Sequence, residues 1–64
     1  MVDLPTRSQI RRGTFVGIET KIDQGTGKLT NGIAEIILTS SEIHPYGIKV
    51  RLEDGRIGRV KRIL

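Results

Sequence analysis

The chain has 64 residues, no cysteine and a formal net charge of +4, from 11 lysines and arginines against seven acidic residues. So short a chain forms one domain with a small core, which neither disulfides nor thiolate metal ligands can stabilise. No apolar run approaches the roughly 18 residues of a membrane span, and no signal peptide is visible. We therefore expect a single domain over residues 1–64, flexible at residues 1–6 and cytoplasmic.

The first predicted element is a short helical turn over residues 7–12. The stretch Thr6-Arg7-Ser8-Gln9 fits a capping box, in which the Thr6 and Gln9 side chains satisfy backbone N–H groups at a helix start. Gly13 would end the turn, and Ile10 would point back to the core. A segment this short has no stability of its own, so tertiary packing must hold it.

Residues 14–22 alternate with a period of two, which predicts the first strand. One face of this strand would carry Thr14, Val16, Ile18, Thr20 and Ile22. Phe15 falls on the opposite, polar face, where its ring is either covered by another segment or exposed. The Gly-, Asn- and Thr-rich residues 23–32 predict a long loop.

A second apolar segment, residues 32–41, suits a helical stripe or a strand. Its isoleucines and short length favour a strand with a bulge near Glu35-Ile36, which lets Ala34 and Ile37 face the same side. A second loop over residues 40–46 follows.

The C-terminal part predicts a β-hairpin. Residues 48–52 alternate between apolar and charged side chains, and Asp54-Gly55 is a strong hairpin signal. In residues 57–63 the apolar side chains fall three apart, which requires either a bulge at Gly58-Arg59 or a break before the terminus. Short strands hide their edges by closing into a barrel. We therefore predict an all-β fold, a small SH3-like or OB-like barrel of four or five short strands with a short N-terminal helical turn.

Four segments cover most of residues 8–63: SQIRRG, TGKLTNGI, ILTSS and HPYGIKVRLEDGRIGRVKRI. In sequence, order and overall length they resemble the YwbE-like family of small uncharacterised proteins. The resemblance implies a compact β fold and transfers no catalytic or binding residue. The stretch VRLEDGRIGRV is also similar to a hairpin of S1-type and other translation-associated OB barrels, although likeness of fold does not establish function.

Motifs for catalysis and metal binding are incomplete. The stretch GTGK at residues 25–28 lacks a Walker A pattern, which would need glycine in place of Ile22 and serine or threonine in place of Leu29. His44 is the only histidine, and residues 40–44 lie on one loop with nothing to orient a catalytic triad. We therefore expect no enzyme, no metal and no cofactor, and the sequence identifies no small-molecule substrate.

The charge excess lies in the C-terminal hairpin. Residues 49–64 carry six basic and two acidic residues, whereas residues 1–48 are neutral. Such a cluster attracts polyanions because neutralised phosphates release counterions; alternatively, it solvates a β surface and serves solubility. The sequence pI of about 10.1 is typical of nucleic-acid-binding domains. The predicted binding residues are Lys49, Arg51, Arg56, Arg59, Lys61 and Arg62, with Arg11, Arg12 and Lys28 as outer members.

The kind of partner follows from two features that the sequence lacks: a set of aromatic residues and a long helix. Phe15 and Tyr46 are the only aromatic residues, so base stacking would contribute little, and no long recognition helix is present for a major groove. We therefore predict a non-enzymatic accessory domain that contacts the backbone of structured RNA, such as ribosomal or transfer RNA. The rival prediction is a protein-interaction module in which Phe15 or Tyr46 anchors a partner or a second copy.

Overall fold

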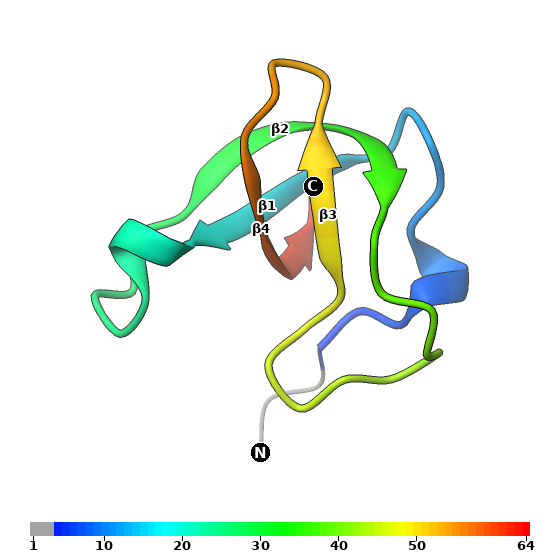
Figure 1. The fold of residues 1–64 in the computed structure, drawn as a ribbon, viewed down its shortest axis with the longest axis horizontal. Coiled ribbons are helices and arrows are strands. Elements are labelled where there is room, and N and C mark those ends of the chain that lie inside the picture. Colours follow the sequence, from blue (N-terminus) through cyan, green and yellow to red (C-terminus); the bar gives the residue numbers. More distant parts are fainter. Residues whose placement is uncertain (1–3) are drawn as a thin grey trace.

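Four antiparallel strands close into a barrel in the computed structural model, which describes residues 4–64 (Figure 1). The strands are β1 (Phe15–Thr20), β2 (Thr30–Ile37), β3 (Lys49–Leu52) and β4 (Ile57–Ile63). Each strand pairs with the next, and β4 pairs with β1, which closes the sheet. The predicted all-β barrel is confirmed. Its simple meander order differs from the Greek-key order of an OB-fold.

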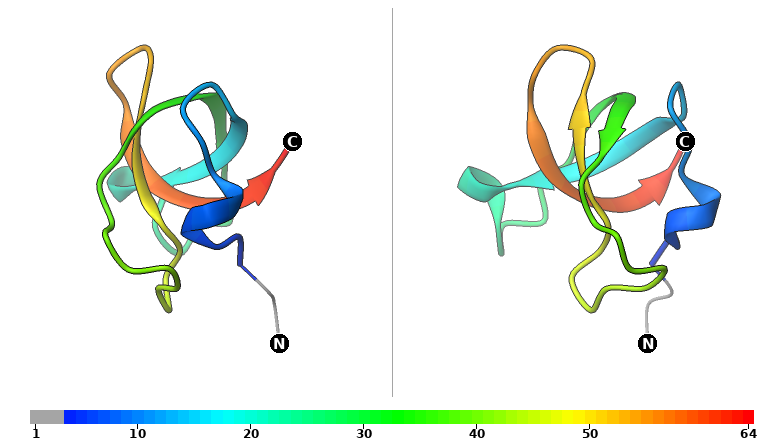
Figure 2. Two further views of the ribbon diagram at one scale, coloured as in Figure 1. Left: turned by 90° about the vertical axis from the view of Figure 1, so that its right-hand side faces the viewer. Right: turned by 45° about the vertical axis from the view of Figure 1, so that its right-hand side comes forward.

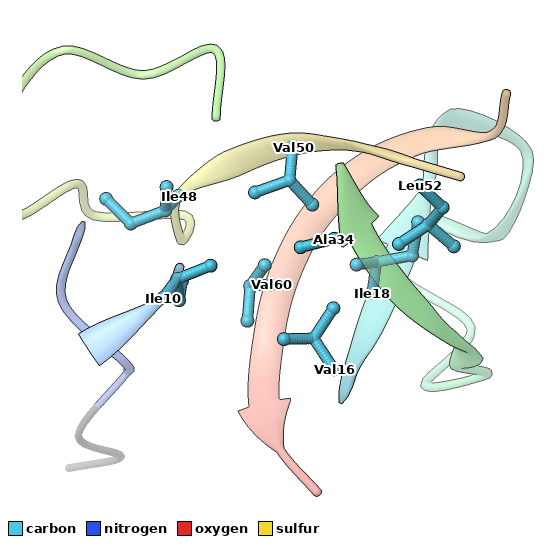
Figure 3. Packing of buried hydrophobic residues seen from close by; sticks show 8 residues of the cluster. All are labelled: Ile10, Val16, Ile18, Ala34, Ile48, Val50, Leu52 and Val60. Atoms are coloured by element: carbon cyan, nitrogen blue, oxygen red, sulfur yellow. The ribbon is translucent and has the colours of Figure 1, made fainter. Parts of the chain in front are cut away.

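The barrel is filled by apolar side chains at the inward positions of the strands. Within residues 4–64 the buried cluster consists of Ile10, Val16, Ile18, Ala34, Ile48, Val50, Leu52 and Val60 (Figure 3). Along β3 the buried Val50 and Leu52 alternate with exposed Lys49 and Arg51, so the predicted alternation is confirmed. Each buried valine, leucine or isoleucine stabilises the fold by roughly 1.5–3 kcal/mol relative to an exposed one.

The N-terminal turn, η1 (Arg7–Gln9), is shorter than the predicted residues 7–12. The Thr6 N–H donates to Gln9 Oε1 at 2.9 Å, as the capping pattern predicts. Ile10 is extended rather than helical, and its side chain is buried in the core as predicted. The predicted flexibility of residues 1–6 falls partly on residues 1–3, which lie outside the described residues.

Hydrogen bonds join η1 to the loop of residues 38–48. The Arg7 N–H donates to the Glu42 carbonyl at 2.8 Å, and Arg7 Nε donates to the Thr39 carbonyl at 2.9 Å. The Ser8 hydroxyl donates to the Glu42 carboxylate, and this bond is the largest cause that lowers the pKa of Glu42. Figure 2 shows η1 and the loop at the same end of the barrel. These contacts hold a turn that has no stability of its own.

The strand predicted for residues 14–22 ends early. β1 stops at Thr20, and a second turn, η2 (Lys21–Asp23), follows, in which Thr20 Oγ1 donates to Asp23 Oδ2 at 3.3 Å. Ile22 was predicted to share a face with Val16, and this is wrong: its side chain is 92% exposed. The residues after β1 project from the left of the barrel in Figure 1.

The predicted loop over residues 23–32 is also too long, because β2 begins at Thr30. The strand and bulge predicted for residues 32–41 are confirmed, although the strand ends at Ile37. Ala34 pairs with Leu52 and Ile36 with Arg51, so the β2–β3 register shifts at this point.

The predicted hairpin at Asp54-Gly55 is confirmed. The Gly55 N–H donates to the Leu52 carbonyl at 2.9 Å, and the Leu52 N–H donates to the Arg56 carbonyl at 2.7 Å. Gly55 has a φ of +94°, and among the described residues only glycines have positive φ. The connection is therefore a three-residue loop that ends in a left-handed glycine, a common hairpin geometry.

β4 is continuous, so the predicted break near the C-terminus does not occur. The bulge lies at Lys61 rather than at Gly58-Arg59, because Ile18 pairs with Val60 while Gly17 pairs with Arg62. Gly58 faces inward, where a Cβ atom would lie 2.6 Å from the Glu19 carbonyl oxygen. Glycine at this position lets β1 and β4 approach closely.

Candidate nucleic-acid interface

Three adjoining hollows follow the outer surface of β4. The first, of about 760 Å³, is lined by the η2 loop, by the start of β2 and by Arg56 and Ile57 after the β3–β4 turn. The second, of about 320 Å³, shares Lys21 and Ile57 with the first. The third, of about 330 Å³, shares Glu19, Gln24 and Arg59 with the second. We refer to the three together as the β4 groove.

Basic side chains dominate the lining of the β4 groove. The basic residues are Lys21, Lys28, Lys49, Arg56, Arg59 and Lys61, and the acidic residues are Glu19 and Asp23. The groove therefore carries four more positive than negative side chains. A concave surface of one charge sign raises the local concentration of oppositely charged ligands.

Two of these cations are directly opposed across neighbouring strands. Lys49 on β3 pairs with Arg59 on β4, and Arg59 pairs in turn with Glu19 on β1. Like charges in directly opposed positions destabilise a sheet. Within residues 4–64 the only ion pair joins Arg56 Nε to Asp54 Oδ2 at 3.4 Å, so no carboxylate of these residues forms a salt bridge with Lys49 or Arg59. Glu19 faces Arg59 without such a bond, and the three side chains keep one positive charge in excess.

Backbone carbonyls position two cations of the groove. A guanidinium N–H of Arg59 donates to the Gly47 carbonyl at 3.3 Å, and Lys61 Nζ donates to the Tyr46 carbonyl at 2.7 Å. Gly47 has a φ of +98°, and a Cβ atom there would lie 2.5 Å from the Val60 carbonyl oxygen. Glycine is needed to bring this turn against β4. Both cations keep further N–H donors for a ligand, since arginine has five and lysine three.

Four predicted cations lie outside the lining of the β4 groove. Arg51 points outward from β3, and Arg62 covers Gly17 on the outer surface of β1. Arg11 and Arg12 are exposed in the turn that precedes β1. The structure therefore places five residues of the predicted set in the lining of one groove: Lys28, Lys49, Arg56, Arg59 and Lys61. Arg51 and Arg62 lie beside this lining, because Arg51 pairs with Ile57 and Arg62 shares the surface over Gly17 with Asn31.

Sequence reasoning missed Lys21 and Gln24, which line the groove from the η2 loop. It assigned Lys21 to the polar face of a strand that ends one residue earlier. The spacing Thr20-x-x-Asp23 is the signal that could have revealed η2, because a threonine three residues before an acidic residue is typical of a helix start.

The two aromatic residues lie in different surroundings. Phe15 lies on the outer surface of β1, opposite Ile33 of β2, and is 48% exposed. Of the two predicted positions for its ring, covered or exposed, the exposed one is correct. Tyr46 is 69% exposed and lines the third hollow. Its ring lies 5.9 Å from that of His44, at an angle of 51°. Only Tyr46 could stack on a ligand in the groove.

The described residues contain neither a group of metal-binding side chains nor a membrane-spanning helix. Over residues 4–64 the structure contains no group of three or more histidine, cysteine and acidic side chains arranged to hold a metal ion. No helix in the same range is long and apolar enough to cross a membrane.

A family model described as "Uncharacterized conserved protein (DUF2196)" matches residues 3–63. The chain belongs to the DUF2196 family. It is 59% identical over 58 residues to the protein named "Uncharacterized protein YwbE" of Bacillus subtilis (strain 168), an alignment that covers 91% of this chain and 89% of that protein. The resemblance to YwbE-like proteins is thus confirmed. No solved structure matches the chain.

Proposed function

We propose that this DUF2196 protein binds RNA without catalysing a reaction, and that the β4 groove receives the phosphate backbone. The observation that carries the proposal is the excess of four positive side chains around the groove, with Lys49 and Arg59 in directly opposed positions. Glu19, opposite Arg59 on β1, offsets only one of these two charges, so a further anion would relieve their repulsion. Phosphate suits this role because the arginine fork and the lysine ammonium both bind phosphate oxygens.

The net charge of the groove sets the number of phosphates that it can neutralise. Six basic and two acidic side chains line the groove, an excess of four positive charges. Each positive charge in excess can neutralise about one phosphate and release its counterion. We therefore expect about four phosphate contacts.

The salt dependence of binding tests the proposal. Four contacts give a slope of log affinity against log salt concentration of about −3 with the coefficient of a single strand and about −3.6 with that of a B-form duplex. Fluorescence anisotropy of a labelled RNA hairpin at several salt concentrations measures this slope. Absence of binding at low salt, or a flat salt response, would overturn the proposal.

A pair of matched variants locates the site. The double substitution Lys28→Gln and Lys49→Gln removes two charges from the groove, and Arg11→Gln with Arg12→Gln removes two charges outside it. The groove variant is expected to weaken binding and to make the slope shallower by about 1.4–1.8, whereas the control keeps the wild-type slope. Equal effects of the two variants would contradict the assignment of the groove.

A second candidate function is a protein-interaction module. It is favoured by the exposed pair of Phe15 and Ile33 on the outer surface of β1 and β2, because exposed apolar clusters on a small domain mark contact sites. Light scattering at increasing protein concentration, with the variant Phe15→Ser, tests for a second copy as the partner. Lost self-association with unchanged RNA affinity would support this function, and a monomer at every concentration would count against it.

A further inference from the structure

Ile22 is an apolar side chain that the fold displays to solvent. It lies in η2 and is 92% exposed, more than any other large apolar residue in the described part of the chain. Hydrogen bonds within the loop hold this arrangement: the Thr26 N–H and hydroxyl both donate to the Asp23 carbonyl, at 3.1 and 2.8 Å, and the Lys28 N–H donates to Thr26 Oγ1 at 3.3 Å. The loop thus presents Ile22 beside the first hollow of the groove.

The first hollow combines apolar and cationic walls. Its apolar side chains are Ile22, Leu29 and Ile57, and its basic ones are Lys21, Lys28 and Arg56. The hollow is shallow and open to solvent, and its volume of about 760 Å³ leaves room for one nucleotide of a longer chain. A site that tracked phosphates alone would need no apolar wall. The combination suits a ligand with a flat apolar face between anionic groups, such as a nucleotide within a chain.

Asn31 gives this hollow a means of reading a base. It points outward from β2 opposite Gly17 and lines the hollow. The amide of asparagine donates and accepts side by side, which matches the N6 and N7 atoms of adenine. This edge of an adenine is accessible when the nucleotide is unpaired, whereas the deep groove of an RNA duplex hides it.

We infer that the first hollow binds one unpaired nucleotide of an RNA, with adenine preferred. The base lies against Ile22, Leu29 and Ile57, and Asn31 contacts its edge. The flanking phosphates are neutralised by the basic side chains that line the same hollow. This inference rests on the proposed function, since the same groove carries the neighbouring phosphates.

The test compares two labelled RNA hairpins that share one tightly stacked, adenine-free loop and differ by one bulged adenine in the stem. At one salt concentration the wild-type protein is expected to bind the bulged hairpin roughly fivefold more tightly, or better, which corresponds to about 1 kcal/mol. Ile22→Ser and Asn31→Ala should each bring this ratio toward one. Neither substitution removes a charge, so the salt slope for the hairpin without the bulge should keep its wild-type value. Ile43→Ser is the matched control, because Ile43 is 73% exposed and lies outside the lining of the hollow.

The outcomes separate this inference from the proposed function. If both hairpins bind equally well to the wild-type protein, the nucleotide site is wrong and phosphate binding stands. If neither binds, both are wrong. A bulge preference that survives Ile22→Ser and Asn31→Ala would also overturn the inference, and amide spectra of both variants establish that they are folded.

Discussion

Alanine substitutions at Gly47 and Gly55 separate two costs: the steric clash of a new Cβ atom and the strain of a positive φ. Both glycines have nearly the same positive φ, +98° and +94°. A Cβ atom at Gly47 would lie 2.5 Å from the Val60 carbonyl oxygen, whereas a Cβ atom at Gly55 would meet nothing within 4 Å. Alanine at either position pays the cost of a positive φ, about 1–2 kcal/mol. Alanine at Gly47 must also displace the backbone of β4, which adds about 1–3 kcal/mol.

We therefore expect Gly55→Ala to lower the free energy of unfolding by about 1–2 kcal/mol and Gly47→Ala by about 2–5 kcal/mol. A domain of this length has a total stability of about 3–10 kcal/mol, so the Gly47 variant is close to unfolding. Urea denaturation followed by far-UV circular dichroism measures both values, because the chain has no tryptophan to report by fluorescence. Equal losses in the two variants would refute the role of close packing at Gly47.

Three further predictions concern the charges and the core. Ser8→Ala removes the hydroxyl that lowers the pKa of Glu42, so the pKa of Glu42, measured by carbon-detected NMR titration, should rise. A carboxyl group whose pKa is lowered in the folded state stabilises the fold at pH values above its ordinary pKa of 4.5. This contribution is lost as the pH falls through the pKa of the folded state. The urea midpoint of Ser8→Ala should therefore change less with pH in this window than the urea midpoint of the wild-type protein. Leu52→Ala should reduce the free energy of unfolding by about 2–5 kcal/mol in urea, because Leu52 is fully buried, and a loss below 1 kcal/mol would contradict its place in the core. Lys49→Glu should raise the free energy of unfolding by about 0.2–1 kcal/mol, because it turns the like-charge pair of residue 49 and Arg59 into a pair of opposite charges. The same substitution should weaken RNA binding. A loss of stability would show that Lys49 and Arg59 do not repel each other.

The parts of the fold that sequence predicts well are those with clean local signals. The alternation in β3, the turn at Asp54-Gly55 and the bulge in β2 follow from side-chain periodicity and turn chemistry. The η2 turn was missed because the period-two pattern continues through Ile22 while Thr20 and Asp23 bond locally and turn the chain. Local side-chain hydrogen bonds of this kind compete with strand formation.

The candidate site was harder to predict because it depends on contacts between strands. The residues opposite one another, such as Lys49 and Arg59, are set by the register of the barrel, which no local pattern reveals. Lys21 and Gln24 enter the site through a loop that folds beside β4. The sequence therefore identified the charge excess and most of the basic residues of the β4 groove. It did not identify the surface that these residues form together with the η2 loop.

The bulge at Lys61 keeps the basic residues at the end of β4 outside the barrel. Strict alternation after Val60 would direct Lys61 outward and Arg62 into the barrel, where an unpaired guanidinium is costly. One extra residue keeps both side chains outside: Lys61 turns toward the Tyr46 carbonyl in the groove, and Arg62 lies over Gly17 on β1. The bulge thus protects the core and gives the two side chains different neighbours: Lys61 lines the third hollow, and Arg62 lies beside Asn31 and Leu29 of the first. Lys21 and Lys28 add positive charge to the groove, although residues 1–48 carry no net charge as a whole.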